Sequence, residues 1–351
     1  MAKQMRQLLK KMRFAKTNSG LLALLLALGA FGAGFIAYLI LDRAFFVKKK
    51  VPAAYEYPIE QLAVIDPGLI VCRQVGSPIE TGLQRASAVD VDAQGILYAA
   101  GDEKILVFSS SGRKEKEIIL PAMPTALKTA EGLLYTALTE RIELYSPQGE
   151  QLAVWANIPG ALLTSIAVGR EDVFAADALH KVVRRFDKQG NPLGLIGQKD
   201  AERGIEGFVV PSPYFDILIA PDGLLRVVNP GRQRVEAYTV DGHLEWHWGS
   251  PSMGIEGFCG CCNPVALAML PDGTFVTAEK GLVRVKLYDD EGNLLGVVAG
   301  PRQLGWQAPI RVCEGPQDCQ VRGLDVAADP QGRIYVLEQV RNTILVFEKI
   351  Q

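Results

Sequence analysis

Ala266-Leu267-Ala268-Met269-Leu270-Pro271-Asp272-Gly273 is followed by TFVTAE at 274–279 and by VRVKLYDDEG at 283–292. The short apolar runs alternate with polar residues and end at turn signals such as Pro-Asp-Gly and Asp-Glu-Gly. Period-two alternation between turns of this kind indicates antiparallel β-strands. A fourth apolar run at 294–298 completes the unit. This stretch therefore predicts a small four-stranded sheet.

The same unit occurs five more times along the chain. The first-strand runs of these copies lie at 88–95, 125–128, 165–168, 216–223 and 323–332. Four strands per unit, at starts roughly 40 to 60 residues apart, are typical of the blades of a β-propeller. No segment of the repeats shows sustained 3.6-residue spacing, which disfavours a stack of helical repeats.

The sixth unit stops at the end of the chain after its third strand. Residues 69–76 resemble the fourth strands of other units, as a comparison with Trp246-His247-Trp248-Gly249-Ser250-Pro251 shows. We predict that strand 69–76 completes the sixth blade and closes the ring, which removes the sheet edges that a linear array would expose. The predicted fold is an all-β, six-bladed propeller over residues 61–351.

Two blades carry a family resemblance. Residues 172–177 with 182–190, and residues 332–338 with 344–347, follow the pattern G-x-I/L-Y-V-A-D and then R/K-V-x-V-F-D-x-x-G. This pattern resembles the NHL-repeat six-bladed β-propellers, here of a membrane-anchored bacterial type. The resemblance covers about residues 61–351. It implies the fold more than the function, because its relatives include protein- and RNA-binding modules, sensor domains, and metal-dependent lyases and lactonases.

The N-terminus predicts a membrane anchor. Residues 1–19 form a basic tail with no acidic residue, and residues 20–41 carry no charge. A helix of that length crosses roughly 30 Å of hydrocarbon, whereas the apolar core of a cleaved signal peptide is usually about 7–15 residues. The positive-inside rule then predicts a cytoplasmic tail, a linker at 42–60 and a propeller outside the cytoplasm, in the periplasm.

All six cysteines follow the predicted anchor. Cys259, Cys261 and Cys262 lie in the link into the fifth blade, Cys313 and Cys319 lie in the link into the sixth, and Cys72 lies on the closing strand. An even number of cysteines in a compartment outside the cytoplasm indicates disulfides. The candidate pairs are Cys313 with Cys319, and Cys72 with one of the three cysteines in the link into the fifth blade. A second hypothesis is a metal or iron–sulfur centre held by the thiolates, and a third is a redox-active thiol pair. Cys261 and Cys262 are adjacent, which is awkward for a disulfide between them.

An alternative site uses the ends of the second strands on the same face of the ring. The residues there are Asp177, Asn229, Glu279 and Glu338. Carboxylate and amide oxygens suit calcium, and sugar-lactonase-type propellers resemble this arrangement. The alternative is that each side chain caps the turn that follows it. The three histidines, His180, His243 and His247, do not converge in the predicted fold, which disfavours the lyase type.

The composition and charge of the chain disfavour nucleic-acid binding. A net charge of −2, with 22% charged residues, carries no basic excess of the kind that nucleic-acid binding needs. The favoured hypothesis is a non-catalytic binding or assembly module. Its cysteine-rich loop docks a membrane or periplasmic protein and holds a metal or iron–sulfur centre for an electron-transfer complex. The alternatives are a calcium-dependent lactonase or lyase and a disulfide-stapled binding propeller without a cofactor, and an enzyme is the less favoured hypothesis.

Overall fold

The computed structural model describes residues 28–38, 59–306 and 323–350. The chain divides into two units, Met1–Tyr57 and Pro58–Gln351. In the first unit, residues 28–38 are helical and exposed. Within the described ranges, no helix has both the length and the apolar character needed to cross a membrane. The anchor expected at 20–41 therefore stays a prediction.

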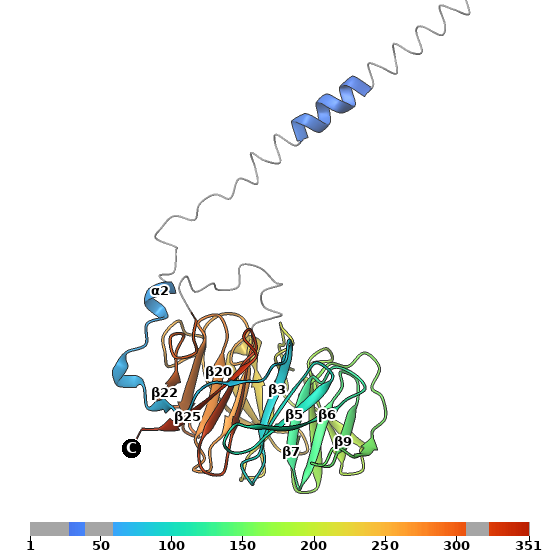
Figure 1. The fold of residues 1–351 in the computed structure, drawn as a ribbon. Helices are drawn as coiled ribbons and strands as arrows, with labels where there is room; N and C mark the ends of the chain where they lie inside the picture. The colour runs from blue at the N-terminus through green and yellow to red at the C-terminus, as the bar shows by residue number, and fades with distance from the viewer. Residues whose placement is uncertain (1–27, 39–58, 307–322, 351) are drawn as a thin grey trace, which may run out of the picture. The chain divides into compact units, whose positions relative to one another are not determined.

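The second unit is a six-bladed β-propeller (Figure 1). Each blade is an antiparallel sheet, and in the first five blades the strands follow one another in chain order. The first strands of the blades contact one another around the axis. The blades are β3 (Ala86–Val91), β4 (Leu97–Gly101), β5 (Lys104–Phe108) and β6 (Lys114–Ile119); β7 (Ala126–Ala130), β8 (Leu133–Ala137), β9 (Ile142–Tyr145) and β10 (Gln151–Val154); β11 (Leu163–Val168), β12 (Asp172–Asp177), β13 (Val182–Asp187) and β14 (Pro192–Ile196); β15 (Ile217–Ile219), β16 (Leu225–Asn229), β17 (Arg234–Tyr238) and β18 (Leu244–Trp248); β19 (Ala266–Met269), β20 (Phe275–Glu279), β21 (Arg284–Tyr288) and β22 (Leu294–Ala299); and β23 (Leu324–Ala328), β24 (Ile334–Glu338) and β25 (Thr343–Lys349).

The sixth blade is built from both ends of this unit. Short helices α2 (Ile59–Leu62) and η2 (Pro67–Leu69) lead into β1 (Cys72–Gln74), which pairs with β25. Cys72 lies opposite Lys349 in this register, and β2 (Ile79–Glu80) also pairs with β25. The sequence predicts a closing strand within 69–76, and β1 lies within that range.

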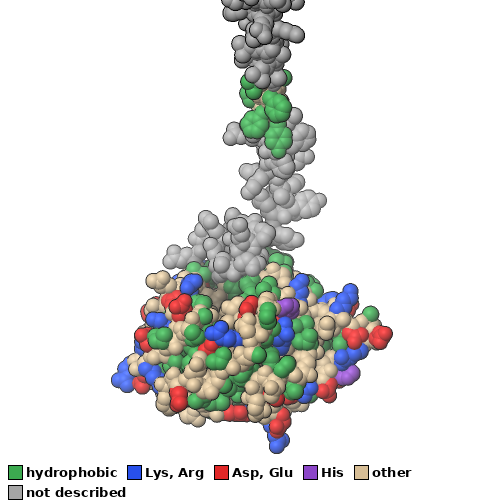
Figure 2. Space-filling model, turned by 90° about the vertical axis from the view of Figure 1, so that its right-hand side faces the viewer, with side chains coloured by type: hydrophobic (Ala, Val, Ile, Leu, Met, Phe, Trp, Pro, Cys, Tyr) green, Lys and Arg blue, Asp and Glu red, His purple; other side chains and the backbone are tan. Residues whose placement is uncertain are grey.

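The hydrophobic core is divided among the six blade interfaces. Strand β4 illustrates this division. All five of its residues are buried, although neighbouring side chains in a strand point to opposite faces of the sheet. Leu97 and Ala99 pack against the sixth blade, whereas Tyr98 and Ala100 pack against the second. Each blade thus buries both faces, mostly with apolar side chains. On the face shown in Figure 2, acidic and basic side chains are interspersed over the propeller surface.

The repeated Gly-Ile-Glu-Gly-Phe segments place an aromatic ring in each of two successive blade interfaces. Phe208 packs 5.0 Å from Phe215, and Phe258 packs 5.6 Å from Tyr288, measured between ring centroids. Each ring covers a glycine at the end of the preceding blade. A Cβ atom at Gly249 would lie 2.7 Å from the Phe258 ring, and the backbone there has a φ of +98°. The repeated segment therefore serves to fill the interface between successive blades with an aromatic side chain.

The fourth strand of one blade was not predicted, and neither was the short strand β2. The fourth strand of the first blade, β6, exposes Lys114 to Glu117 and buries only Ile118. It lacks the apolar alternation that marks the other outer strands, and pairing with β5 alone holds it in the sheet. The sequence pattern could not identify it because its outward face is charged throughout.

The packing around Gly249 gives a stability prediction. We expect Gly249→Ala to lower the free energy of unfolding by about 1–3 kcal/mol, because the added methyl group overpacks the Phe258 ring. Gly223→Ala is the matched control, since Gly223 has a φ of +83° but nothing within 4 Å of its Cβ position. Urea denaturation of both variants separates overpacking from backbone strain. Equal losses in the two variants would contradict the packing role of Phe258.

Candidate ligand-binding site

An axial channel runs between the first strands of the six blades. Its volume is about 470 Å³, and its wall includes residues from β3, β7, β11, β15, β19 and β23. Alanine, leucine and methionine side chains make up much of this wall, with Met123 and Met269 among them. The channel is a concave, largely apolar space with a few polar groups, which is the usual form of a small-molecule site.

The first charged pair in the channel joins blades one and two. Lys128 Nζ lies 2.9 Å from Asp90 Oδ1, and the backbone N–H and hydroxyl of Thr129 donate to Asp90 Oδ2. Burial alone would lower the pKa of Lys128, but the carboxylates of Asp90, Asp216 and Asp325 raise it more. Lys128 is therefore charged and neutralised by Asp90.

Two further carboxyl groups face the channel without a lysine of their own. Asp216 accepts hydrogen bonds from Ser165 Oγ at 2.5 Å and from the backbone N–H of Leu267 at 2.6 Å. Asp325 accepts from the backbone N–H of Val89 at 2.8 Å. Each acid thus connects its own blade to a neighbour at the axis. A carboxylate has about four lone-pair positions, so both groups keep capacity for a ligand.

The environment raises the pKa of both carboxyl groups. Burial, and then repulsion by Asp216, raise the pKa of Asp325 to about 8, against an ordinary value of 3.8. Burial likewise raises the pKa of Asp216, against the opposing effect of its hydrogen-bond donors. Raised carboxyl pKa values inside a pocket are characteristic of functional sites. A positive charge entering the channel would favour the ionised forms of both groups.

The charged residues of the channel could not be recognised as a site from the sequence. Asp90, Lys128, Asp216 and Asp325 all fall within the first-strand runs that defined the repeat. A polar residue in an alternating strand looks like an ordinary solvent-facing position. The signal that could have found them is topological, since in a propeller the first strand of each blade faces the axis.

The alternative axial set does not come together. Asp177 accepts from Arg184 Nε at 2.8 Å and from the backbone N–H of His180 at 3.1 Å, in the turn that follows it. Glu338 accepts from the backbone N–H of Arg341 at 2.9 Å and from its guanidinium. Both side chains therefore cap the following turn, as the second interpretation of this set proposed.

Asn229 and Glu279 are also engaged locally. Asn229 donates to Glu236 at 2.9 Å. Glu279 accepts from Arg284 at 3.1 Å, and Lys286 Nζ lies 2.7 Å from its other oxygen. All three side chains of this blade-five group are fully buried. Their positive charges also hold the Gly-Ile-Glu-Gly-Phe segment, because Lys286 donates to the carbonyl of Gly257.

The cysteines of the blade-five link point to two different places. Cys261 Sγ lies 3.7 Å from Cys262 Sγ, whereas the Cys259 thiol lies against Glu279 and Arg284. Cys313 and Cys319 lie outside the described residues. The four described cysteines, Cys72 included, are free thiols. The expected disulfide between Cys72 and one of the loop cysteines is therefore not formed, because Cys72 packs into the aliphatic core between blades five and six.

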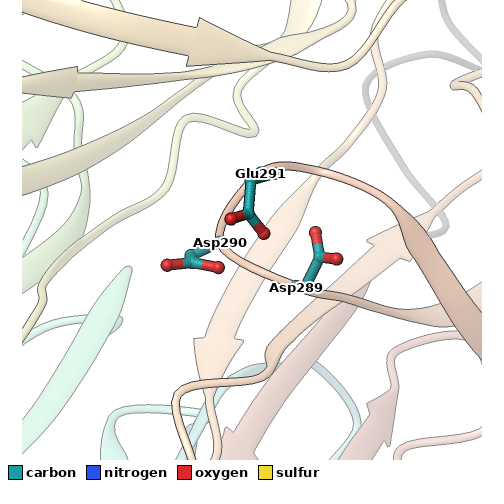
Figure 3. A group of neighbouring side chains, drawn as sticks. All are labelled: Asp289, Asp290 and Glu291. Carbon is teal, nitrogen blue, oxygen red and sulfur yellow. The ribbon is translucent and has the colours of Figure 1, made fainter.

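One group of three potential metal ligands comes together in the described ranges. Asp289, Asp290 and Glu291 form it in the turn between β21 and β22 (Figure 3). Asp290 and Glu291 are exposed, and Asp289 accepts two hydrogen bonds from Asn293 across the turn. This acidic turn is a capped hairpin on the surface.

The histidines lie outside the channel wall. His180 follows β12 in a turn, with Nδ1 2.7 Å from Asp177. His243 lies in the turn before β18, and His247 lies on β18, the outer strand of its blade. The expectation that they do not converge on the axis is confirmed.

Comparisons with solved structures support the fold. A streptogramin B lyase matches with a TM-score of 0.52 and 12% identity, over 81% of this chain and 100% of that one. A protein of unknown function from Bacteroides thetaiotaomicron matches with a TM-score of 0.55 and 14% identity, over 79% of this chain and 71% of that one. Virginiamycin B lyase from Staphylococcus aureus gives a TM-score of 0.50 and 11% identity, over 80% and 100%. At these identities the likeness shows the six-bladed fold alone. No protein-family model and no curated protein sequence matches the chain.

The buried blade-five group gives a second stability prediction. We expect Glu279→Gln to lower the free energy of unfolding by about 3–5 kcal/mol, because Arg284 and Lys286 then lack a buried counter-charge. Asp290→Asn, an exposed acid beyond the next strand, is the control and should change stability by less than about 0.5 kcal/mol. Urea denaturation measures both. A Glu279→Gln variant as stable as the control would show that the group is not a buried ion pair.

The raised pKa of Asp325 predicts a pH-dependent stability. The folded state holds the proton up to about pH 8, whereas the unfolded chain releases it near pH 3.8. The unfolded state therefore binds fewer protons between these values, and the free energy of unfolding falls as the pH rises through this window. Asp325→Asn removes this loss, so its stability relative to the wild type should improve between pH 5 and pH 8. An equal difference at both pH values would contradict the raised pKa.

Proposed function

We propose that the propeller binds a small organic ligand with an ammonium group in its axial channel. The observation that carries this proposal is the pair Asp216 and Asp325, two protonatable carboxyl groups that face one channel. The channel lysine is already paired with Asp90 at 2.9 Å. A cationic group between Asp216 and Asp325 would favour the ionised form of both carboxyl groups and offset the repulsion between their charges.

The size and lining of the channel favour an organic ligand over a bare metal ion. Small-molecule pockets occupy about 300–1,000 Å³, and the 470 Å³ channel lies in this range. Leu218, Leu267 and Met269 offer apolar surface to the body of a ligand. Calcium, the ion of the lactonase hypothesis, takes six to eight oxygen ligands. The oxygens of Asp216 and Asp325 already accept backbone hydrogen bonds, which leaves fewer of them for a metal.

A lyase activity has less support. One of the similar structures is a catalytically inactive virginiamycin B lyase, a histidine-to-alanine variant, with quinupristin. In this chain all three histidines lie away from the channel, and none of them lines it. We therefore propose binding rather than histidine-dependent elimination as the role of the channel.

Two proposals rest on the sequence alone. We propose that residues 20–41 anchor the chain in a membrane with the propeller in the periplasm. We also propose that the cysteine-bearing face docks a membrane or periplasmic protein. An electron-transfer role would further require a metal or iron–sulfur centre at the cysteines.

Calorimetry with choline, putrescine and calcium chloride tests the binding proposal. We expect an ammonium compound to bind, with an affinity that rises up to about tenfold per pH unit below the Asp325 pKa of about 8 and levels off above it. The reason is that the cation must displace a proton below that pKa.

The variants make the test specific to the channel. Asp216→Asn and Asp325→Asn should each weaken binding at least about tenfold, since hydrogen bonds to charged groups contribute about 1.5–3 kcal/mol. Asp290→Asn should leave binding unchanged. Binding of calcium alone would contradict the ligand class in favour of a metal site. No binding, or equal effects of all three variants, would contradict the axial site itself.

A further inference from the structure

Cys261 and Cys262 form a dithiol on the link into the fifth blade. Their sulfur atoms lie 3.7 Å apart, which is van der Waals contact, and both are free thiols. The two differ in access, because Cys261 is exposed and Cys262 is 3% exposed. The Cys261 sulfur is therefore accessible to a reagent from solution, whereas the Cys262 sulfur in contact with it is buried.

The backbone around this dithiol is fixed by side chains from neighbouring turns. Asn263 donates to the carbonyls of Cys259 at 2.6 Å and of Lys280 at 2.8 Å, and accepts from the backbone N–H of Lys280 at 2.9 Å. Gln233 Nε2 donates to the carbonyl of Gly260. The link is thus held on both sides of the sulfur pair, and the contact between the sulfurs is a property of this packing.

The buried sulfur lies in a polar environment. Burial raises the pKa of the Cys262 thiol to about 11, while the Lys280 ammonium and the Ser212 hydroxyl act to lower it. Lys280 Nζ lies 3.1 Å from Ser212 Oγ and 4.3 Å from the centroid of the Tyr214 ring. Tyr214 also lines the axial channel. The Cys262 thiol is therefore connected to a channel residue through Ser212 and Lys280.

We propose that Cys261 and Cys262 form a reversible disulfide with each other by exchange with a small organic disulfide. The Cys261 thiolate attacks one sulfur of the reagent and releases the first thiolate, leaving a mixed disulfide on Cys261. The Cys262 thiolate then attacks the Cys261 sulfur and releases the second. The two cysteine protons pass to the two released thiolates, and the reagent gains the two electrons that the cysteines lose.

The adjacency of the two residues makes this disulfide a labile one. Consecutive Cα atoms lie about 3.8 Å apart across a trans peptide, whereas disulfides usually join Cα atoms about 4.4–6.8 Å apart. The bridged state is therefore strained, and strained disulfides have more oxidising potentials than structural ones. We infer that the pair alternates between the reduced dithiol and the disulfide and does not form a permanent structural disulfide.

Peptide mass mapping of the full chain tests the proposal. Reduced protein is incubated with oxidised glutathione, quenched with an alkylating reagent, denatured and digested. The peptide that contains Cys259, Cys261 and Cys262 should lose the mass of two hydrogen atoms and take one alkyl group, on Cys259, instead of three, and dithiothreitol should reverse both changes. Cys259→Ser should behave like the wild type, because the Cys259 thiol faces Glu279 and Arg284.

Two single variants resolve the order of the steps. Cys262→Ser should stop at a stable glutathione adduct on Cys261, and Cys261→Ser, which alters only an exposed side chain, should leave Cys262 unmodified. The proposal is overturned if both wild-type thiols stay alkylatable, or if the bridge maps to Cys259, Cys313 or Cys319. A bound metal that survives purification and protects the pair from glutathione would also overturn it, in favour of a thiolate metal site.

Discussion

Pairing between β1 and β25 is the contact on which the ring depends. Every other blade is formed from consecutive strands, but the sixth needs a strand from the opposite end of the propeller unit. Six hydrophobic clusters lie between successive blades, and each requires a blade on both sides. Without this pairing the outer edge of β25 would be exposed, and the sixth blade would be one strand short.

Closure also decides where chemistry is possible. Because both faces of each blade are buried against neighbours, a side chain can reach a ligand only from the axis, the loops or the outer edge. The channel acids use the first of these routes. Asp216 and Asp325 serve the fold by connecting blades at the axis, and the same burial that lets them do so raises the pKa of both groups. Asp216 and Asp325 therefore connect the blades and also form the proposed binding site.

The architecture could be predicted because each blade is marked by a local sequence pattern, in which alternating apolar runs are separated by turn residues. Alternation and turn residues identify all six blades, together with the fourth strand of five of them, the closing strand of the sixth blade included. The fourth strand of the first blade, β6, was missed because its outward face is charged and does not alternate, and the short strand β2 was missed as well. The candidate site could not be predicted in the same way. Asp325 and Asp216 lie on blades six and four, far apart in sequence, and no spacing indicates that they face one channel. The three loop cysteines looked like one cluster, yet the side-chain directions of Cys259 and Cys262 separate them.

The location of β1 also affects the order in which the protein can be completed during synthesis. The strand leaves the ribosome before any blade exists, and its partner β25 is made after the first five blades. Until then, β1 has no sheet to join and blades one and five have one unpartnered face each toward the missing blade. The nascent chain therefore carries an unpaired β1 strand while the first five blades are made.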